Sequence, residues 1–334
     1  MPTFTNKKSL YYNDVNLLGR PAPSHIKSRS QVPQEKWRII VSPMHALIGP
    51  KFIVEAAKNG ISVFLHRFNS LEWQKEMYDL FYANSTGENF CCAATGLKDF
   101  EKNIQFFLNN NIENAGIEIA NGYLDLIEYY HLLQDNISGG YPKFKRFYVG
   151  NVNTQDGIFH LEDFKHICEE LIIRVGIGGG VACSSSDTAS INRGNITEII
   201  ECSEVCSDRV MIAADGGISK SGFGVKAFAA GADYIMMGGY FSKAQEAETN
   251  ISGQGFYWGG ASEKQLEILG QVGKHSEGKI LPPNKELFPL KKLVDDFWGG
   301  LASYVTYSGY DSLEKAISNG LFEVKENSLP PKRR

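Results

Sequence analysis

The residue of this chain whose surroundings most favour chemistry is Cys183. It follows three glycines at 178–180, precedes three serines, and comes just after the apolar, β-branched run at 172–177. Glycines let a backbone turn tightly and approach a ligand, and a thiol at the end of a buried strand can act as a thiolate nucleophile. Isolated cysteines, however, are more often small buried apolar residues. The rest of the chain must decide between these two interpretations.

Two glycine pairs follow apolar runs later in the chain, in ADGG at 214–217 and in MMGG at 236–239. Small residues with free backbone N–H groups suit a phosphate, and Asp215 could hold ribose hydroxyls. Either pair alone would be explained equally well by a simple turn. Their occurrence at two successive strand ends favours a bound nucleotide or sugar phosphate.

Eight short apolar runs predict the strands that position these residues. They lie at 38–44, 61–66, 90–95, 115–120, 146–150, 172–177, 210–215 and 234–238, with helical patterns between them at 51–59, 71–82, 97–109, 123–133, 161–170, 195–206 and 221–230. Alternating strands and helices predict an α/β fold with parallel pairing, and eight units favour a (β/α)8 TIM barrel over an open doubly wound sheet. The site should lie at the carboxyl ends of the strands.

The domain organisation that we expect is an N-terminal arm at 1–37, a catalytic barrel at 38–320 and a flexible C-terminal tail at 321–334. Within the barrel, residues 253–285 are rich in Gly, Ser and charge and show little periodicity, which predicts a long mobile lid loop. Two further helices are expected at 290–297 and 313–319.

Composition narrows the class of protein. The 334 residues carry a net charge of -4, which argues against nucleic-acid or anionic-membrane binding. We see neither a secretory signal nor a membrane-spanning run, and the six cysteines include no CxxC pair. We therefore expect a cytoplasmic protein with reduced thiols and no zinc site.

Five motifs give the chain a resemblance to a known family. They are VGNVNT at 149–154, VGIGGGVACSS at 175–185, AADGGI at 213–218, GADYIMMGG at 231–239 and SEGK at 276–279. The chain resembles the IMP dehydrogenase and GMP reductase enzymes, without the CBS insert that most of the dehydrogenases carry. LHRFNSLEW at 65–73, IANGY at 119–123 and GGLASYVTYSG near the end resemble the reductases, and the lid lacks the Arg-Tyr pair of the dehydrogenases.

The resemblance implies NADPH-dependent reductive deamination of GMP, or of a related purine nucleotide, to IMP and ammonia. Cys183 would attack the purine C2 and form a covalent thioimidate. Ser185 takes the place of the catalytic threonine and Glu277 that of the lid glutamate, a pair that would carry the proton to the departing amine. The alternatives are IMP dehydrogenase-like oxidation of IMP with NAD, and a catalytically inactive purine-nucleotide-binding protein.

The resemblance also implies binding residues and an assembly. The substrate would contact Ser42, Met44, Asp215, Gly216, Gly217, Gly238, Gly239, Gly259, Gly260 and Gly278. The cofactor would contact Ser28, Arg29, Arg67, Glu118, Ala120, Asn121, Ser303, Tyr304 and Thr306. The carbonyls of Gly176, Gly178 and Cys183 match a potassium site, and a homotetramer is expected, with neither nucleic acid nor membrane as a partner.

Several residues depart from the family pattern. Gly179 replaces a proline, Val181 replaces a phosphate-binding serine, and His45 stands where an aspartate is usual. Arg67 replaces a lysine, Glu118 replaces an aspartate, and Gly260 and Ala261 replace Met and Ser. The thiol and the proton relay remain, whereas the walls and the phosphate cradle change, so a modified purine nucleotide or a deoxynucleotide is also open. We expect His45 to contact the base or the nicotinamide.

Overall fold

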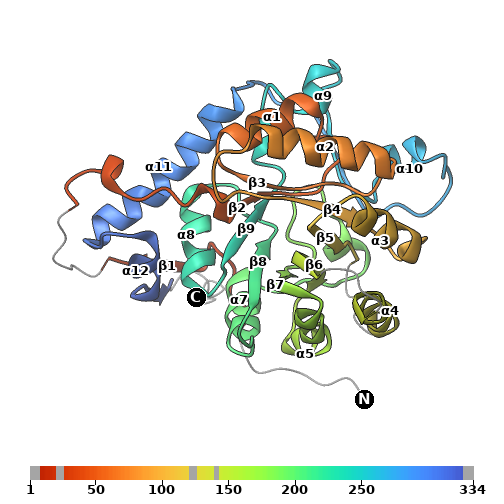
Figure 1. The fold of residues 1–334 in the computed structure, drawn as a ribbon. Coiled ribbons are helices and arrows are strands. Elements are labelled where there is room, and N and C mark those ends of the chain that lie inside the picture. Colours follow the sequence, from red (N-terminus) through yellow and green to blue (C-terminus); the bar gives the residue numbers. More distant parts are fainter. Residues whose placement is uncertain (1–7, 20–25, 120–125, 139–142, 326–334) are drawn as a thin grey trace, which may run out of the picture.

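Eight parallel strands close into a barrel that helices surround (Figure 1). The computed structural model describes residues 8–19, 26–119, 126–138 and 143–325. In chain order, which is also barrel order, the strands are β2 (Ile39–Val41), β3 (Ser62–Phe64), β4 (Cys91–Thr95), β5 (Asn114–Ile117), β6 (Phe144–Val152), β7 (Cys168–Val175), β8 (Val210–Asp215) and β9 (Tyr234–Met237). Because β9 pairs with β2, the barrel has no free edge. The predicted TIM barrel is confirmed.

The helices that cover the barrel follow the strands in turn. They are α1 (Pro50–Lys58), α2 (Leu71–Asn84), α3 (Phe100–Asn109), α4 (Leu126–Ser138), α5 (Gln155–Leu161), α7 (Asn195–Ser203) and α8 (Ser221–Ala229). A proline, a capping hydroxyl or a glycine marks the start of α1, α2, α5 and α7. Pro50 occupies the first turn of α1, and the Ser70 side chain accepts a hydrogen bond from the Trp73 N–H at the start of α2.

The predicted helix at 161–170 is wrong. Helix α5 already ends at Leu161, a 3-10 turn covers Glu162–His166 (η3), and strand β7 begins at Cys168. The segment 161–171 places buried apolar side chains at 161, 164, 167, 168 and 171, a spacing that imitates a helix. Pairing of β7 with both β6 and β8 decides the outcome, because the barrel needs this backbone as a strand.

The barrel interior is filled with side chains. A separate apolar cluster inside it comprises Ile40, Phe64, Phe90, Cys92, Ala94, Tyr148, Ile172, Ala213, Tyr234 and Met236. Tyr148 stacks on Phe64 with ring centroids 4.1 Å apart, and a Cβ atom on Gly116 would overlap the Tyr148 ring. A ligand must therefore bind at an end of the barrel and not within it.

The lid at 253–285 carries short elements of secondary structure that its sequence did not predict. It contains β10 (Tyr257–Trp258), α10 (Glu263–Ile268) and β11 (Ile280–Leu281), and β10 pairs antiparallel with β11. Three residues of the lid are buried: Tyr257, Trp258 and Gln265. These few anchors hold the lid although its sequence has little periodicity.

The two ends of the described chain pair with each other. Strand β1 (Val15–Leu18), from the predicted arm, pairs antiparallel with β12 (Leu321–Val324). The first four residues of the predicted flexible tail are therefore a strand, and residues 326–334 lie outside the described residues. Between them, α11 (Leu290–Ser308) is much longer than the predicted helix at 290–297, and α12 (Leu313–Ser318) follows. Helix α11 continues through Gly299 and Gly300 because Gly300 packs directly on Ser221 of α8.

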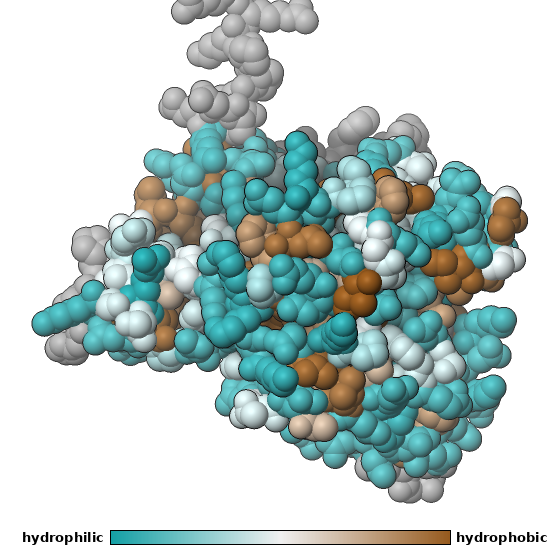
Figure 2. Space-filling model, turned by 90° about the horizontal axis from the view of Figure 1, so that it is seen from above, coloured by the Kyte–Doolittle hydropathy of each residue, from teal (hydrophilic) through white to brown (hydrophobic). Residues whose placement is uncertain are grey.

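The surface has no extended apolar face on the side seen in Figure 2, where apolar residues form small separate patches among hydrophilic ones. Within the described ranges, no helix is long and apolar enough to cross a membrane.

Candidate active site

The thiol of Cys183 lies in the loop between β7 and α6 (Ser185–Thr188), at the carboxyl end of the barrel. The side chain is half-buried, and its Sγ donates a hydrogen bond to the Ser185 Oγ at 3.3 Å. The Cys183 N–H donates to the Gly180 carbonyl at 3.0 Å, which folds the glycine loop back beneath the thiol. The predicted neighbours Cys183 and Ser185 are therefore in direct contact.

The lid is joined to this loop through its backbone. Cys183 and Gly278 form an antiparallel bridge, the Ser184 N–H donates to the Glu277 carbonyl at 3.4 Å, and the Lys279 N–H donates to the Ala182 carbonyl at 2.9 Å. The structure thus brings the three predicted catalytic residues to one place. Cys183 and Glu277 are 94 positions apart in the sequence, so only the fold brings them together.

Two more lid glycines pack closely on their neighbours, Gly259 on the cysteine loop and Gly260 on Phe68. A Cβ atom on Gly259 would lie 2.5 Å from the Ala182 carbonyl oxygen, so only glycine lets the lid approach the cysteine loop so closely. A Cβ atom on Gly260 would lie 3.2 Å from the Phe68 ring, which occupies the space on that side.

The predicted phosphate cradle assembles from separate strand ends. Gly216 and Gly217 both have positive φ angles, 100° and 76°, and Gly216 packs on the backbone of Gly179. A Cβ atom on Gly238 would lie 3.3 Å from the Ser42 Cβ and 3.5 Å from the Met44 Cγ. These predicted substrate residues therefore lie at the carboxyl ends of β2, β8 and β9.

Two side chains at the cradle differ in what they offer a phosphate. Val181 is 57% exposed and its Cγ1 lies against Gly239, so an apolar group stands at this edge. The Tyr257 hydroxyl lies against Gly238 on the other side. Burial and the nearby Asp215 raise the pKa of Tyr257, which keeps the hydroxyl protonated and able to donate. Sequence reasoning missed Tyr257, although an aromatic pair after a glycine-rich stretch was a visible signal.

A buried charge network supports Asp215. The Arg174 Nη2 donates to the Asp215 Oδ2 at 2.9 Å, and the Asn151 Nδ2 donates to the same oxygen at 2.7 Å. Glu118 lies 3.7 Å from the Arg67 Nε and 4.0 Å from the Arg174 Nη1. Burial raises the pKa of Glu118, and the two arginines oppose that effect. One Asp215 oxygen is thus already engaged, and sequence reasoning missed Arg174, which lies inside the strand run.

Four ring side chains and one amide pack together, and we call them the aromatic wall: His45, His66, Phe68, Trp258 and Gln265. His45 directly follows Met44 in the chain. The His45 Nδ1 lies 3.2 Å from the Gln265 Oε1, and the Trp258 Nε1 donates to that same oxygen at 3.1 Å. The His45 and His66 rings are 4.7 Å apart. Burial, followed by the neighbouring His45, lowers the pKa of His66 to about 3, and burial also lowers the pKa of His45.

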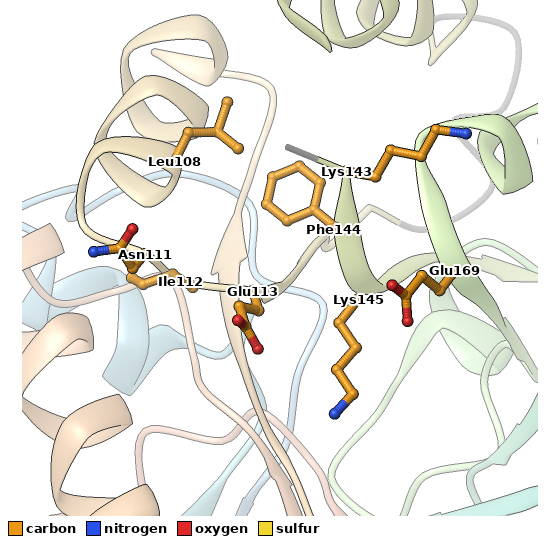
Figure 3. Close-up of a pocket in the computed structure, with 8 residues that line it drawn as sticks. All are labelled: Leu108, Asn111, Ile112, Glu113, Lys143, Phe144, Lys145 and Glu169. Carbon is orange, nitrogen blue, oxygen red and sulfur yellow. The ribbon is translucent and has the colours of Figure 1, made fainter. Parts of the chain in front are cut away.

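Two cavities lie at the other end of the barrel. One of about 350 Å³, shown in Figure 3, is lined by Leu108, Asn111, Ile112, Glu113, Lys143, Phe144, Lys145 and Glu169, around the amino-terminal ends of β5 to β7. The amines of Lys143 and Lys145 point in different directions there (Figure 3). A second cavity, of about 760 Å³, opens at the same end beside Arg38 and Tyr234. Because barrel chemistry takes place at the carboxyl ends, neither cavity is the candidate site.

Comparison with known proteins identifies the family of this chain. The profile of the IMP dehydrogenase / GMP reductase domain matches residues 9–328. The chain belongs to this family. It is 29% identical to the GMP reductase of Escherichia coli K12, 28% to that of Salmonella typhi and 27% to that of Shewanella halifaxensis, in each case over 96% of both chains.

The cofactor residues implied by the family fall into two groups in one chain. Arg67 and Glu118 lie at the barrel mouth, whereas the others lie on η1 (Arg29–Gln31) and α11, on the outside of the barrel. In that outer group the Arg29 Nη1 donates to the Ser303 Oγ at 3.2 Å. The outer group comprises Ser28, Arg29, Ser303, Tyr304 and Thr306, and the remaining two, Ala120 and Asn121, lie outside the described residues. An exposed guanidinium beside serine hydroxyls fits the phosphates of a dinucleotide.

The implied potassium site fits less well. The Asn151 Nδ2 donates to the Gly176 carbonyl at 2.8 Å, so a protein donor already uses one of the three expected ligand oxygens. In the described part of the chain, no group of three or more His, Cys, Asp or Glu side chains is arranged to hold a metal ion.

Proposed function

We propose that this protein is a GMP reductase-like oxidoreductase that converts GMP, or a related purine nucleotide, to IMP and ammonia with NADPH. The observation that carries the proposal is the contact between the Cys183 Sγ and the Ser185 Oγ at 3.3 Å, in a loop onto which the Glu277 segment of the lid is hydrogen-bonded. A nucleophile and a hydroxyl on one loop, with an acid group on the lid segment bonded to that loop, suit an amine displacement that needs both covalent attack and proton transfer.

The proposed reaction begins when the Cys183 sulfur forms a bond to the purine C2. The bond from C2 to the 2-amino group breaks, and the amine leaves as ammonia after it gains a proton through Ser185 and Glu277. NADPH, when bound, supplies the hydride that C2 gains. The bond from sulfur to C2 then breaks, which releases IMP and returns the Cys183 thiolate.

The remaining residues bind and orient. Backbone N–H groups at Gly217, Gly238 and Gly239, with the Tyr257 hydroxyl, would hold the 5′-phosphate. The free oxygen of Asp215 would accept from the ribose, because Arg174 and Asn151 fix the other oxygen. The outer cofactor group lies away from this mouth, which supports a homotetramer in which neighbouring subunits complete the cofactor site.

The test compares purified protein given GMP and NADPH with protein given IMP and NAD. We expect turnover with the first pair. Cys183→Ala should abolish it and leave the Kd for GMP within a few fold, whereas Cys206→Ala is a matched control, because Cys206 is also half-buried but its Sγ donates to the Cys202 carbonyl. Turnover only with IMP and NAD, or nucleotide binding with no turnover by any pair, would contradict the proposal.

A further inference from the structure

The hydrogen bonds of the aromatic wall determine which nitrogen of His45 carries a proton. An indole N–H can only donate, so the Gln265 atom facing the Trp258 Nε1 at 3.1 Å must be the amide oxygen. The same oxygen lies 3.2 Å from the His45 Nδ1. Because an amide oxygen can only accept, the His45 Nδ1 must be the donor.

The other ring nitrogen is then an acceptor. Burial lowers the pKa of His45 and keeps the ring neutral, so a proton on Nδ1 leaves a lone pair on Nε2. Gln265 is fully buried and Trp258 is 5% exposed, which prevents water from turning the amide around. Among the described residues, the only side-chain hydrogen bond found for His45 is the one to Gln265.

His45 lies beside residues of the candidate site. Its ring stacks on the Phe68 ring with centroids 6.5 Å apart, and a Cβ atom on Gly260 would lie 3.2 Å from that Phe68 ring. His45 follows Met44, which packs beside Gly238 of the phosphate cradle. Trp258 precedes Gly259, which packs on the Ala182 carbonyl next to Cys183. The wall therefore connects the cradle to the nucleophile loop.

We infer that His45 is a specificity-determining residue whose Nε2 accepts a hydrogen bond from a neutral N–H donor of a bound ligand. Two ligands of the proposed reaction carry such a donor: the 2-amino group of the purine and the carboxamide of the nicotinamide. Gln265 and Trp258 are positioning residues, since they act by selecting the His45 tautomer. The inference rests on the proposed function for the identity of the ligands, although its test needs no turnover.

The direct test measures equilibrium binding of GMP, IMP and NADP⁺ by calorimetry to the wild type, His45→Asn and His45→Gln. Asparagine places an amide N–H near the position of Nδ1, so it can still reach Gln265, but it has no acceptor at the position of Nε2. Glutamine places an amide near the Nε2 position.

If the donor is the purine amine, His45→Asn should raise the Kd of GMP about three- to tenfold, the range expected for one hydrogen bond, and leave the Kd of IMP unchanged. If the donor is the carboxamide, only the Kd of NADP⁺ should rise. His45→Gln should recover part of the loss in either case. Unchanged Kd values for all three ligands would overturn the inference, and thermal unfolding of each variant will show whether it is folded.

The tautomer itself can be observed separately by ¹⁵N NMR of histidine-labelled protein, with the His45 signals assigned by their loss in His45→Asn. We expect the wild type to be protonated at Nδ1, and Gln265→Leu to shift toward the Nε2-protonated form and to weaken binding of the same ligand as His45→Asn. A wild-type signal from an Nε2-protonated ring would overturn the inference even if binding changes. Absence of GMP reduction by the wild type would remove the proposed function but leave these measurements decisive for His45.

Discussion

His66 should make the folded protein sensitive to mild acid. Burial lowers its pKa to about 3, against 6.5 for the ordinary side chain. The unfolded chain therefore binds a proton at His66 as the pH falls below 6.5, while the folded protein does not until near pH 3. This difference stabilises the unfolded state by about 2 kcal/mol at pH 5 and by about 4 kcal/mol near pH 3, at 1.36 kcal/mol per pH unit.

The assay is urea unfolding of the wild type and His66→Asn between pH 7.5 and pH 5. Asparagine keeps an acceptor for the Phe68 N–H, which donates to the His66 Nδ1 at 3.4 Å, but it cannot take up a proton. It loses the stacking on Trp73, whose ring is 4.7 Å away, and this cost should be the same at every pH. The wild type should therefore lose about 2 kcal/mol more than the variant over this range.

His131→Asn is the matched control, because His131 is exposed. The free energy of unfolding of this variant should change with pH as that of the wild type does. If the free energies of unfolding of wild type and His66→Asn fall in parallel with pH, the folded protein accepts the proton at His66 and the reasoning from burial is refuted.

Three further changes test the cradle, the charge network and the lid. Val181→Ser should lower the Kd for GMP by up to about tenfold, measured by calorimetry, because it adds a hydroxyl where an exposed apolar side chain now stands; an unchanged Kd would place the phosphate elsewhere. Arg174→Met should cost about 3 to 5 kcal/mol in urea unfolding, since it leaves buried carboxylates without their cation; a loss below about 1 kcal/mol would contradict this. Gly259→Ala should lower kcat at least about tenfold, because its Cβ would lie 2.5 Å from the Ala182 carbonyl oxygen and push the lid away. Gly222→Ala is the control, since Gly222 has open space around it and kcat should not change. Equal steady-state kinetics for both variants would refute the need for close lid contact.

The strands of this fold could be predicted because a barrel strand is buried on both faces. Runs such as Ile39–Val41 and Ser62–Phe64 contain no exposed residue, and each is followed by a turn rich in glycine or polar residues. Strand β8 (Val210–Asp215) has the predicted bounds. Elements that depend on distant partners were predicted less well: β7 begins inside an apparent helix, and β12 exists only because β1 pairs with it.

The same distinction applies to the site. Cys183 and Ser185 are two residues apart, and the glycine pairs are local motifs, so a linear reading could find them. Arg174 with Asp215 and His45 with Gln265 are separated by 41 and 220 residues, and only the folded barrel brings each pair together. The partner that fixes a tautomer or engages a carboxylate oxygen is therefore the information that residue type and spacing cannot provide.

The departures from the family pattern are not independent of one another, because the structure places several of them in contact. Arg67 and Glu118 replace a lysine and an aspartate, and their side chains lie 3.7 Å apart, so the charge pair is kept at the mouth with longer members. Gly260 replaces a methionine exactly where the Phe68 ring fills the adjoining space. The first pair of changes preserves charge and the Gly260 change preserves volume. Together they alter the walls around a ligand without disturbing the Cys183–Ser185 contact. For the function that we propose, these changes would affect which nucleotide is bound and not the reaction at the sulfur.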